Sequence, residues 1–338
     1  MYQNVYKYDE MKRSEHMAVR QTAGWYYWTH QLLEVTGKDT AAFLDRMFAN
    51  PVANLKVGRD RYTTMLNEKA EIIDDVVVLR LEEDRFWVST LFIKKMTAWF
   101  DAHLGEEDAA YEDVTKKWDM YAVQGPRSRD LVNALTDTPV DEQKFFSIAD
   151  NSIEGIPVKI NRGGFTGEKL GYEIYVSPEQ GAAIEKKLRE KGEAFDAKEV
   201  TDFQIMAISL PTEAGFYYMR DLMYTNPFEV GLERGIGWDR DFIGREALER
   251  IREQGPSREM LGFTVEKADV HIQHKGFGGP GDPVLLNGTE VGRVSKFTYS
   301  FVKEINIGYI LAEKGALKVG DHVSVHGFDG VIAVKPFI

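Results

Sequence analysis

The texture of the sequence changes near residue 255, and this change constrains the fold more than any other feature. Before it, short apolar runs typical of strands alternate with segments of helical periodicity. After it, short β-rich pieces are separated by turns rich in glycine and aspartate, such as 278–283, 287–288 and 328–330. We therefore expect an α+β fold in the longer first part and a small all-β barrel after it.

The first part contains the order strand, strand, helix, strand, helix. Strand patterns lie between residues 72 and 88, a helix follows, 121–123 is a short apolar strand, and Pro126 suits the first turn of another helix. A similar order recurs between residues 158 and 252. A length of 338 residues suits two or three domains, and the recurring order is typical of two split βαβ layers.

The composition excludes several classes of function. The chain has 42 lysines and arginines against 54 aspartates and glutamates, a formal charge of −12, so nucleic acid is a poor partner. It has no cysteine, which excludes disulfides, thiolate zinc sites and iron–sulfur ligation. No stretch reaches the ~20 apolar residues of a membrane span, and the first residues have no signal-peptide core. We therefore expect a cytoplasmic protein that does not act at a membrane.

Common catalytic and metal-binding motifs are absent from the sequence. It contains no G-x-G-x-x-G after a strand, no Walker loop, no H-E-x-x-H and no G-x-S-x-G. Among the seven histidines, His271 and His274 have a spacing that suits a shared metal on a helix, which their surroundings do not favour. We expect no metal site.

Six segments distributed along the chain form a recognisable set. They are Val35-Thr-Gly-Lys-Asp with Phe43-Leu44, Tyr62-Thr-Thr-Met-Leu-Asn-Glu with Asp74-Asp75, Val123-Gln-Gly-Pro, Gly164-Phe-Thr-Gly-Glu with Gly171-Tyr-Glu, Asn226-Pro-Phe-Glu-Val-Gly-Leu, and Asp241-Phe-Ile-Gly-Arg-Glu-Ala-Leu. In this order they resemble the folate-dependent aminomethyltransferase family, typified by the T-protein of the glycine cleavage system. A resemblance of this kind indicates a fold before it indicates a reaction.

The resemblance implies a three-lobed cloverleaf. Two split-βαβ lobes and a C-terminal barrel would surround a central channel that holds tetrahydrofolate as cofactor, and the chain would be a one-carbon transferase. We expect residues 1–50 together with 145–255 to form the folate-binding lobe, 51–144 the second α+β lobe, and 256–338 the barrel.

Glu173 is the strongest candidate for holding the pterin ring of tetrahydrofolate. Strand alternation places it on the face opposite Tyr172 and Ile174. A carboxylate can pair with the two adjacent N–H donors at the edge of a pterin. The alternative is a solvent-facing glutamate on a half-buried strand, but the preceding G-F-T-G-E segment favours the pterin. We assign Phe165, which replaces the tyrosine usual in the family, and Met65 to the same ligand.

Two positions depart from the family pattern. The resemblance implies an aspartate near the reacting folate nitrogen, in the helix after the strand at 86–88, and an arginine that contacts folate. Aligned without gaps, these positions fall on Met96 and Ala207. Met96 shares a helical face with Phe92 and Trp99, which favours core packing. We therefore expect that the glycine-cleavage reaction is not catalysed unchanged.

Aromatic residues are concentrated in two segments that the resemblance places along the channel. Demethylation needs a weak acid near the leaving oxygen, and tyrosine or histidine can supply it. The alternative is that the aromatic residues only pack against one another. We assign substrate binding to Trp25 and Tyr26, and candidate acid catalysis to Tyr27, His30, Tyr217 and Tyr218.

The sequence thus favours a tetrahydrofolate-dependent methyltransferase that demethylates a small methoxy, methylthio or methylamino compound and forms 5-methyltetrahydrofolate. Its partner would then be a small-molecule methyl donor. One alternative is an aminomethyltransferase that works with a lipoyl carrier protein. The other is a folate-binding protein without turnover.

Overall fold

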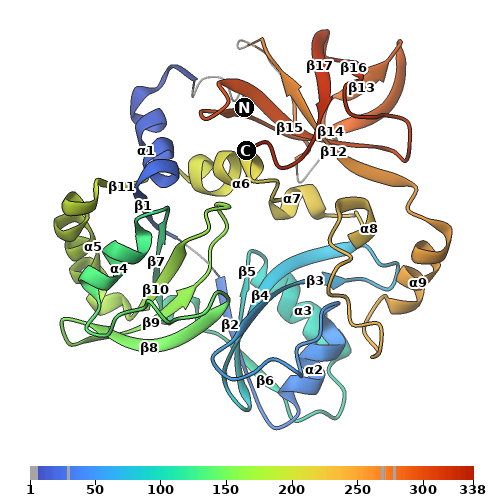
Figure 1. Ribbon diagram of the computed structural model, residues 1–338. Helices are drawn as coiled ribbons and strands as arrows, with labels where there is room; N and C mark the ends of the chain where they lie inside the picture. Colours follow the sequence, from blue (N-terminus) through green and yellow to red (C-terminus); the bar gives the residue numbers. More distant parts are fainter. Residues whose placement is uncertain (1–6, 29–30, 268–269, 271, 277–278) are drawn as a thin grey trace.

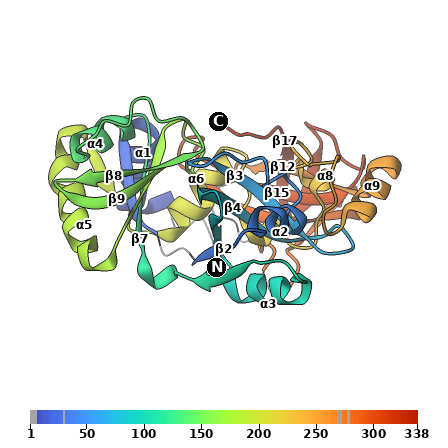
Figure 2. The same ribbon diagram turned by 90° about the horizontal axis from the view of Figure 1, so that it is seen from below.

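The strands of the protein form two open sheets and a closed barrel, arranged around the middle of the molecule (Figure 1). Seen from below, the molecule is a flattened body with α4 and α5 at one end and α9 at the other (Figure 2). The predicted α+β fold with a C-terminal barrel is confirmed. The computed structural model describes residues 7–28, 31–267, 270, 272–276 and 279–338.

The first sheet has six strands, in the order β11-β1-β7-β10-β9-β8. Helices α4 (Ser128–Leu135) and α5 (Pro178–Gly192) cover one of its faces, and their leucine, valine and isoleucine side chains join the strand residues in one buried cluster. The strands are β1 (Ala23–Tyr27), β7 (Asp119–Gln124), β8 (Ser147–Ile153), β9 (Ile156–Arg162), β10 (Gly171–Val176) and β11 (Ala197–Glu199).

The second sheet has five strands, in the order β3-β4-β5-β2-β6, with α2 (Thr40–Met47) and α3 (Ile93–His103) packed on one face. Along β4, Asp74, Val76 and Val78 are buried on the helix-covered face, and Asp75 and Val77 point to the other side. The strands are β2 (Gln31–Thr36), β3 (Asp60–Leu66), β4 (Ile72–Glu82), β5 (Arg85–Thr90) and β6 (Ala110–Asp113).

The predicted division into lobes at residues 50 and 144 stays a prediction, but sheet membership crosses both positions. β2 precedes residue 50 and belongs to the five-stranded sheet, and β7 precedes residue 144 and lies in the middle of the six-stranded sheet. The chain therefore passes from one sheet to the other more than once. A third buried cluster, with Trp87, Met120 and Tyr175, fills the space between the uncovered faces of the two sheets.

The C-terminal part is a closed barrel in the order β12-β15-β14-β13-β16-β17, and no helix lies within residues 279–338. Its interior holds Phe263, Phe297 and Ile310 among other apolar side chains. Closure leaves no unpaired sheet edge. The strands are β12 (Arg258–Val265), β13 (Pro283–Leu286), β14 (Thr289–Ser300), β15 (Ile305–Glu313), β16 (His322–Val325) and β17 (Phe328–Ala333).

Short helices between residues 205 and 254 connect the sheets to the barrel. In the Asn226-Pro-Phe-Glu segment, the Asn226 side chain accepts hydrogen bonds from the Phe228 and Glu229 amides, and the Glu229 carboxylate accepts one from the Asn226 amide. This motif is therefore a helix start. The connecting elements are η4 (Ile205–Ser209), α6 (Leu210–Glu213), α7 (Met219–Leu222), α8 (Pro227–Val230) and α9 (Arg245–Gln254).

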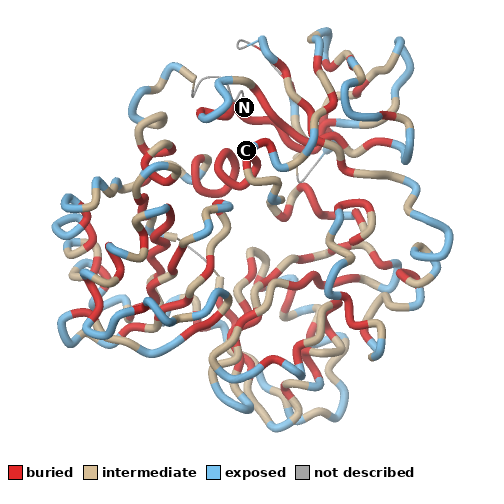
Figure 3. Tube along the Cα trace, in the orientation of Figure 1, coloured by how far each residue is buried: buried red, intermediate tan, exposed pale blue. Residues whose placement is uncertain are grey.

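Glu213, at the end of α6, joins three parts of the molecule. This carboxylate is fully buried, and α6 stands out as a buried segment near the centre (Figure 3). It lies 3.0 Å from His16 Nε2 and 2.9 Å from Arg20 Nη2, both on α1 (Glu10–Gln21), and accepts a 2.5 Å hydrogen bond from Ser300 on β14. The six-stranded sheet and the barrel are therefore held together through one charged group.

Candidate functional site

The aromatic residues of β1 divide between the two faces of the six-stranded sheet. Trp25 is 2% exposed in the core beneath α4 and α5, and the Tyr27 hydroxyl donates to Asp119 Oδ1 at 2.9 Å on that same face. Tyr26 and Trp28 point the other way, toward the cluster between the sheets. The structure therefore separates Trp25 and Tyr27 from Tyr26, and His30 lies outside the described residues.

Glu173 lies half-buried on β10, beside Ala122 of β7 and Asn161 of β9. Its Oε2 accepts hydrogen bonds from Asn161 Nδ2 at 3.0 Å and from the Tyr175 hydroxyl at 3.1 Å. Burial raises the pKa of Glu173, and the two hydrogen bonds partly offset this rise. The side chain is thus a held acceptor and not a freely solvated surface group.

A second carboxylate, Asp60 at the start of β3, comes close to Glu173. It is 4% exposed, and within the described part of the chain no donor reaches either of its oxygens with ordinary hydrogen-bond geometry. Burial and the charge of Glu173 raise the pKa of Asp60 to about 7, and the Asn161 amide partly opposes this rise. Buried acceptors without donors are costly, so a ligand rich in N–H groups would be stabilised here.

Phe165 belongs to a row of aromatic rings on the inner face of the six-stranded sheet. The inner face of each open sheet is the one that its helices do not cover and that faces the cluster between the two sheets. Its ring centroid lies 4.6 Å from that of Trp28, Trp28 stacks on Phe203 at 5.5 Å, and Phe203 meets Tyr218 edge-on at 6.2 Å. The row extends from near the sheet to α7. Met65, in contrast, is 1% exposed in the core beneath α2 and α3, on the far side of the five-stranded sheet from this row.

Tyr217 and Tyr218 take different positions beside α7. The Tyr217 hydroxyl donates to the Val230 carbonyl at 3.0 Å and contacts Lys335 Nζ, and burial raises the pKa of this phenol. The Tyr218 ring lies with its face toward Lys296 Nζ, 5.3 Å from the ring centroid. The Tyr217 hydroxyl is therefore held by its own contacts, and Tyr218 lies at the end of the row of aromatic rings.

Asp75 on β4 is a further candidate site residue, which the sequence analysis does not single out. It is half-buried on the inner face of its sheet, and the Tyr62 hydroxyl donates to its Oδ2 at 3.0 Å. Burial, together with the charge of Asp221, raises the pKa of Asp75 to about 6. The sequence signal was available, because two adjacent aspartates interrupt an otherwise apolar strand, Ile72-Ile-Asp-Asp-Val-Val-Val.

The neighbouring Asp74 points to the opposite face. It is 1% exposed and accepts a 2.5 Å hydrogen bond from Thr90, and burial raises its pKa to about 8. Met96 is fully buried in the core on that same face, so it is a packing residue. The inner-facing acid of this sheet is therefore on β4 and not on α3, which removes the argument that the chain lacks a suitable aspartate.

The described residues were also searched for metal-binding groups of side chains and for membrane-spanning helices. They contain no group of three or more histidine, aspartate or glutamate side chains arranged to hold a metal ion. Within the same residues, no helix is long and apolar enough to cross a membrane.

The sequence is similar to those of known aminomethyltransferases. Residues 1–240 match the family model described as the GCVT N-terminal domain. The chain is 30% identical to an aminomethyltransferase of Halalkalibacterium halodurans over 93% of its own length and 85% of the relative. It is 31% identical to an aminomethyltransferase of Symbiobacterium thermophilum, over 92% and 84% of the two chains.

The fold has a counterpart among solved structures. The crystal structure of the glycine cleavage system aminomethyltransferase T from Bartonella henselae superimposes with a TM-score of 0.85, covering 97% of this chain and 89% of the other. The two sequences are 22% identical, so this likeness supports the fold alone.

Proposed function

The chain belongs to the aminomethyltransferase family of the GCVT N-terminal domain, and we propose that it transfers the one-carbon unit of an aminomethyl group, carried on a lipoyl protein, to tetrahydrofolate. The predicted family, enzyme class and tetrahydrofolate dependence are confirmed. For the reaction itself, the alternative is better supported than the demethylation of a small compound that the sequence favoured. The observation that carries the proposal is that Asp75 lies on the inner face of its sheet. It provides the acid that the position of Met96 lacks.

The residues around Glu173 fit the pterin of tetrahydrofolate. Glu173 lies close enough to Asp60 for its charge to raise the pKa of Asp60, and no described donor reaches the Asp60 oxygens in ordinary hydrogen-bond geometry. Adjacent N–H groups on a heterocycle match such acceptors through charge-assisted hydrogen bonds. The Trp28 and Phe165 rings supply apolar surface on the same side of the sheet. Tetrahydrofolate brings the nitrogen atoms that accept the one-carbon unit.

Asp75 is suited to moving a proton during the transfer. A carboxylate with a pKa of about 6 is largely ionised at neutral pH, yet close enough to it to give the proton back. The Tyr62 hydroxyl, 3.0 Å from Oδ2, fixes the orientation of the carboxylate. With the substrates bound, Asp75 would take the proton that the attacking folate nitrogen loses and return it to the amino group, whose bond to the carbon breaks as it leaves as ammonia. The carbon–sulfur bond to the lipoyl group would break when the second folate nitrogen bonds to the carbon, and the sulfur would leave as the thiol with the proton of that nitrogen.

The proposal is tested by supplying two kinds of donor. With an aminomethyl-loaded lipoyl carrier protein and tetrahydrofolate, we expect release of ammonia and formation of 5,10-methylenetetrahydrofolate. With a panel of methoxy, methylthio and methylamino compounds, we expect no 5-methyltetrahydrofolate. If only the second product forms, the protein is a demethylase. Formation of neither product, with normal binding of tetrahydrofolate, would favour a folate-binding protein without turnover.

Glu173→Gln is expected to weaken tetrahydrofolate binding. The glutamine keeps one acceptor oxygen but loses the charge and places an N–H₂ group toward an N–H donor. A hydrogen bond to a charged group contributes about 1.5–3 kcal/mol, so affinity should fall roughly ten- to a hundredfold. Isothermal titration calorimetry measures this change directly.

The matched control is Glu179→Gln, an exposed glutamate in the first turn of α5, which should bind as the wild type does. Because Glu173 is only half-buried, its variant should unfold at nearly the wild-type temperature. Unchanged tetrahydrofolate affinity in Glu173→Gln would transfer the role to Asp60, and Asp60→Asn would then become the decisive variant.

A further inference from the structure

A buried ion pair lies where α7 meets the barrel. Lys296 on β14 is 1% exposed, and its Nζ lies 2.7 Å from Oδ2 of Asp221 on α7. The same Asp221 oxygen accepts the Tyr218 amide at 3.0 Å. The Asp221 carboxylate neutralises the buried Lys296 ammonium group, because an unpaired charge at a buried position would be very costly. Asp221 is therefore not available to neutralise any other cation.

Arg220, the residue next to Asp221, has no such partner. Within the described part of the chain its guanidinium forms no ion pair and no hydrogen bond, and its Nε is buried without an acceptor. The guanidinium carbon lies 5.8 Å from the centroid of the Tyr218 ring. A half-buried arginine with unused donors favours an acceptor from outside the protein.

The surroundings of Arg220 carry an excess of positive charge. Burial and the charges of Arg220 and Lys296 lower the pKa of His274 to about 4, so this imidazole is neutral. Lys275 donates to the Met223 carbonyl at 2.6 Å, and its pKa is lowered by burial. Its acidic neighbours are Asp221 and Glu229, which are occupied by Lys296 and Arg258.

The count of formal charges in this region is positive. The cations are Arg220, Arg258, Lys275 and Lys296, and the carboxylates within electrostatic range are Asp75, Asp221 and Glu229. One positive charge remains even when Asp75 is fully ionised. Arg220 is half-buried, so part of its side chain can be reached by a ligand.

We propose that Arg220, backed by Lys296 and Lys275, is a binding site for a carboxylate of a ligand. Arginine presents two parallel N–H donors that match the two oxygens of a carboxylate. Two ligands of this enzyme class can bring that group, the glutamyl tail of the folate or a donor that carries a carboxylate of its own. The first source rests on the proposed function, and the second does not require it.

The experiment compares wild type with Arg220→Gln in two binding measurements without turnover. Calorimetry compares tetrahydrofolate with tetrahydropteroate, which lacks the glutamate. Ligand-observed NMR compares propionate with the uncharged 1-propanol. If Arg220 binds the folate tail, wild type should bind tetrahydrofolate roughly tenfold more tightly than tetrahydropteroate. If Arg220 binds the carboxylate of a donor, wild type should bind propionate but not propanol.

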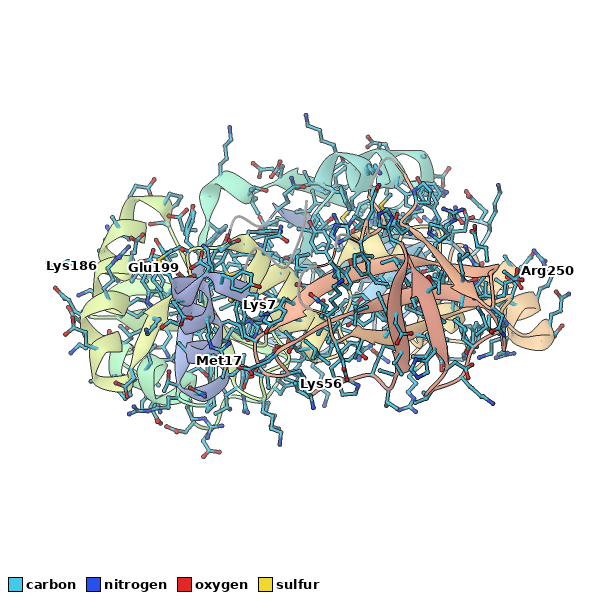
Figure 4. All side chains as sticks on the ribbon, turned by 90° about the horizontal axis from the view of Figure 1, so that it is seen from above. Lys7, Met17, Lys56, Lys186, Glu199 and Arg250 are labelled. Carbon is cyan, nitrogen blue, oxygen red and sulfur yellow. The ribbon has the colours of Figure 1, made fainter. Side chains whose placement is uncertain are left out.

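In either case Arg220→Gln should remove the preference, and Arg220→Lys should keep part of it because the charge remains without the paired donors. The control is Arg250→Gln, an exposed arginine on α9 at the periphery of the molecule (Figure 4), which should behave as the wild type does. Arg220→Gln breaks no ion pair among the described residues, so its melting temperature should stay close to that of the wild type.

The proposal is overturned if wild type shows neither preference, or if Arg220→Gln retains every preference that wild type shows. The proposed function fails differently. It fails if the aminomethyl assay gives no product, and that assay does not enter the binding comparison. If tetrahydrofolate itself does not bind, the propionate measurement still decides the role of Arg220.

Discussion

Replacing Glu213 with alanine is expected to lower the free energy of unfolding by about 3–5 kcal/mol, the cost of removing one partner from a buried charge network. The substitution leaves Arg20 and His16 beside an empty site and takes away the acceptor of Ser300. Because these partners come from α1 and β14, the loss weakens contacts between the six-stranded sheet and the barrel. Urea denaturation followed by tryptophan fluorescence measures the change.

The control for this variant is Glu253→Ala, an exposed glutamate on α9, for which a change within about 0.5 kcal/mol is expected. Glu213→Gln should fall between the two, since it keeps the shape and one acceptor but loses the charge. If Glu213→Ala has the same free energy of unfolding as wild type, the network contributes no net stability.

The same network predicts how acid affects the protein. Burial alone would raise the pKa of Glu213, but the charges of His16 and Arg20 and the hydrogen bonds lower it to about 2, against 4.5 for a free glutamate. The stabilisation is therefore fully present above pH 4.5 and is lost as the pH falls through 2. The Glu213→Gln variant should show a smaller loss of stability across this interval than wild type.

The layers of the fold follow from local patterns that a sequence contains. The turns rich in glycine and aspartate after residue 255 predict short strands, and the barrel is confirmed. Which sheet each strand joins depends on contacts between distant segments. The chain therefore places β2 and β7 in sheets that proximity along the sequence does not indicate.

The candidate site shows the same limit of local reasoning. Alternation along β10 correctly predicts that Glu173 faces away from Tyr172, which is buried in the helix-covered core. The same alternation applies to β1, where it separates Trp25 and Tyr27 from Tyr26, but the sequence pattern does not predict a strand at these residues. Asp60 has no such local signal. Its proximity to Glu173 exists only because two sheets meet.

The expectation about the reaction depends on where the acid lies, which local patterns do not settle. An alignment without gaps sought the acid on the helix at Met96, whose buried position excludes it. The inner-facing carboxylate lies about twenty residues earlier, at Asp75, within one of the segments that carry the family resemblance. A carboxylate in the middle of an apolar strand needs either a partner or a task, and this property can be identified from a sequence.

Asp75→Asn is accordingly expected to lower kcat by roughly 10²–10⁴-fold, the usual contribution of general acid–base catalysis. Asparagine keeps the size and can still accept from Tyr62, but it cannot take up a proton. Affinity for tetrahydrofolate should change little, because Glu173 and Asp60 hold the pterin in the proposed function. The melting temperature should equal or exceed that of wild type, since a pKa raised by burial means that the folded state holds this charge at a cost.

Two further variants and a pH profile make this prediction specific. Asp74→Asn, on the helix-covered face, and Asp84→Asn, in the exposed turn before β5, should both keep kcat within a few-fold of wild type. Because Asp75 must be ionised to accept the proton, wild-type kcat should fall as the pH drops below about 6 and level off above it. Asp75→Asn should lack this dependence. If its kcat is close to that of wild type, or if Asp74→Asn is the slower variant, the proton is carried by another group and the inner face of β4 only lines the site.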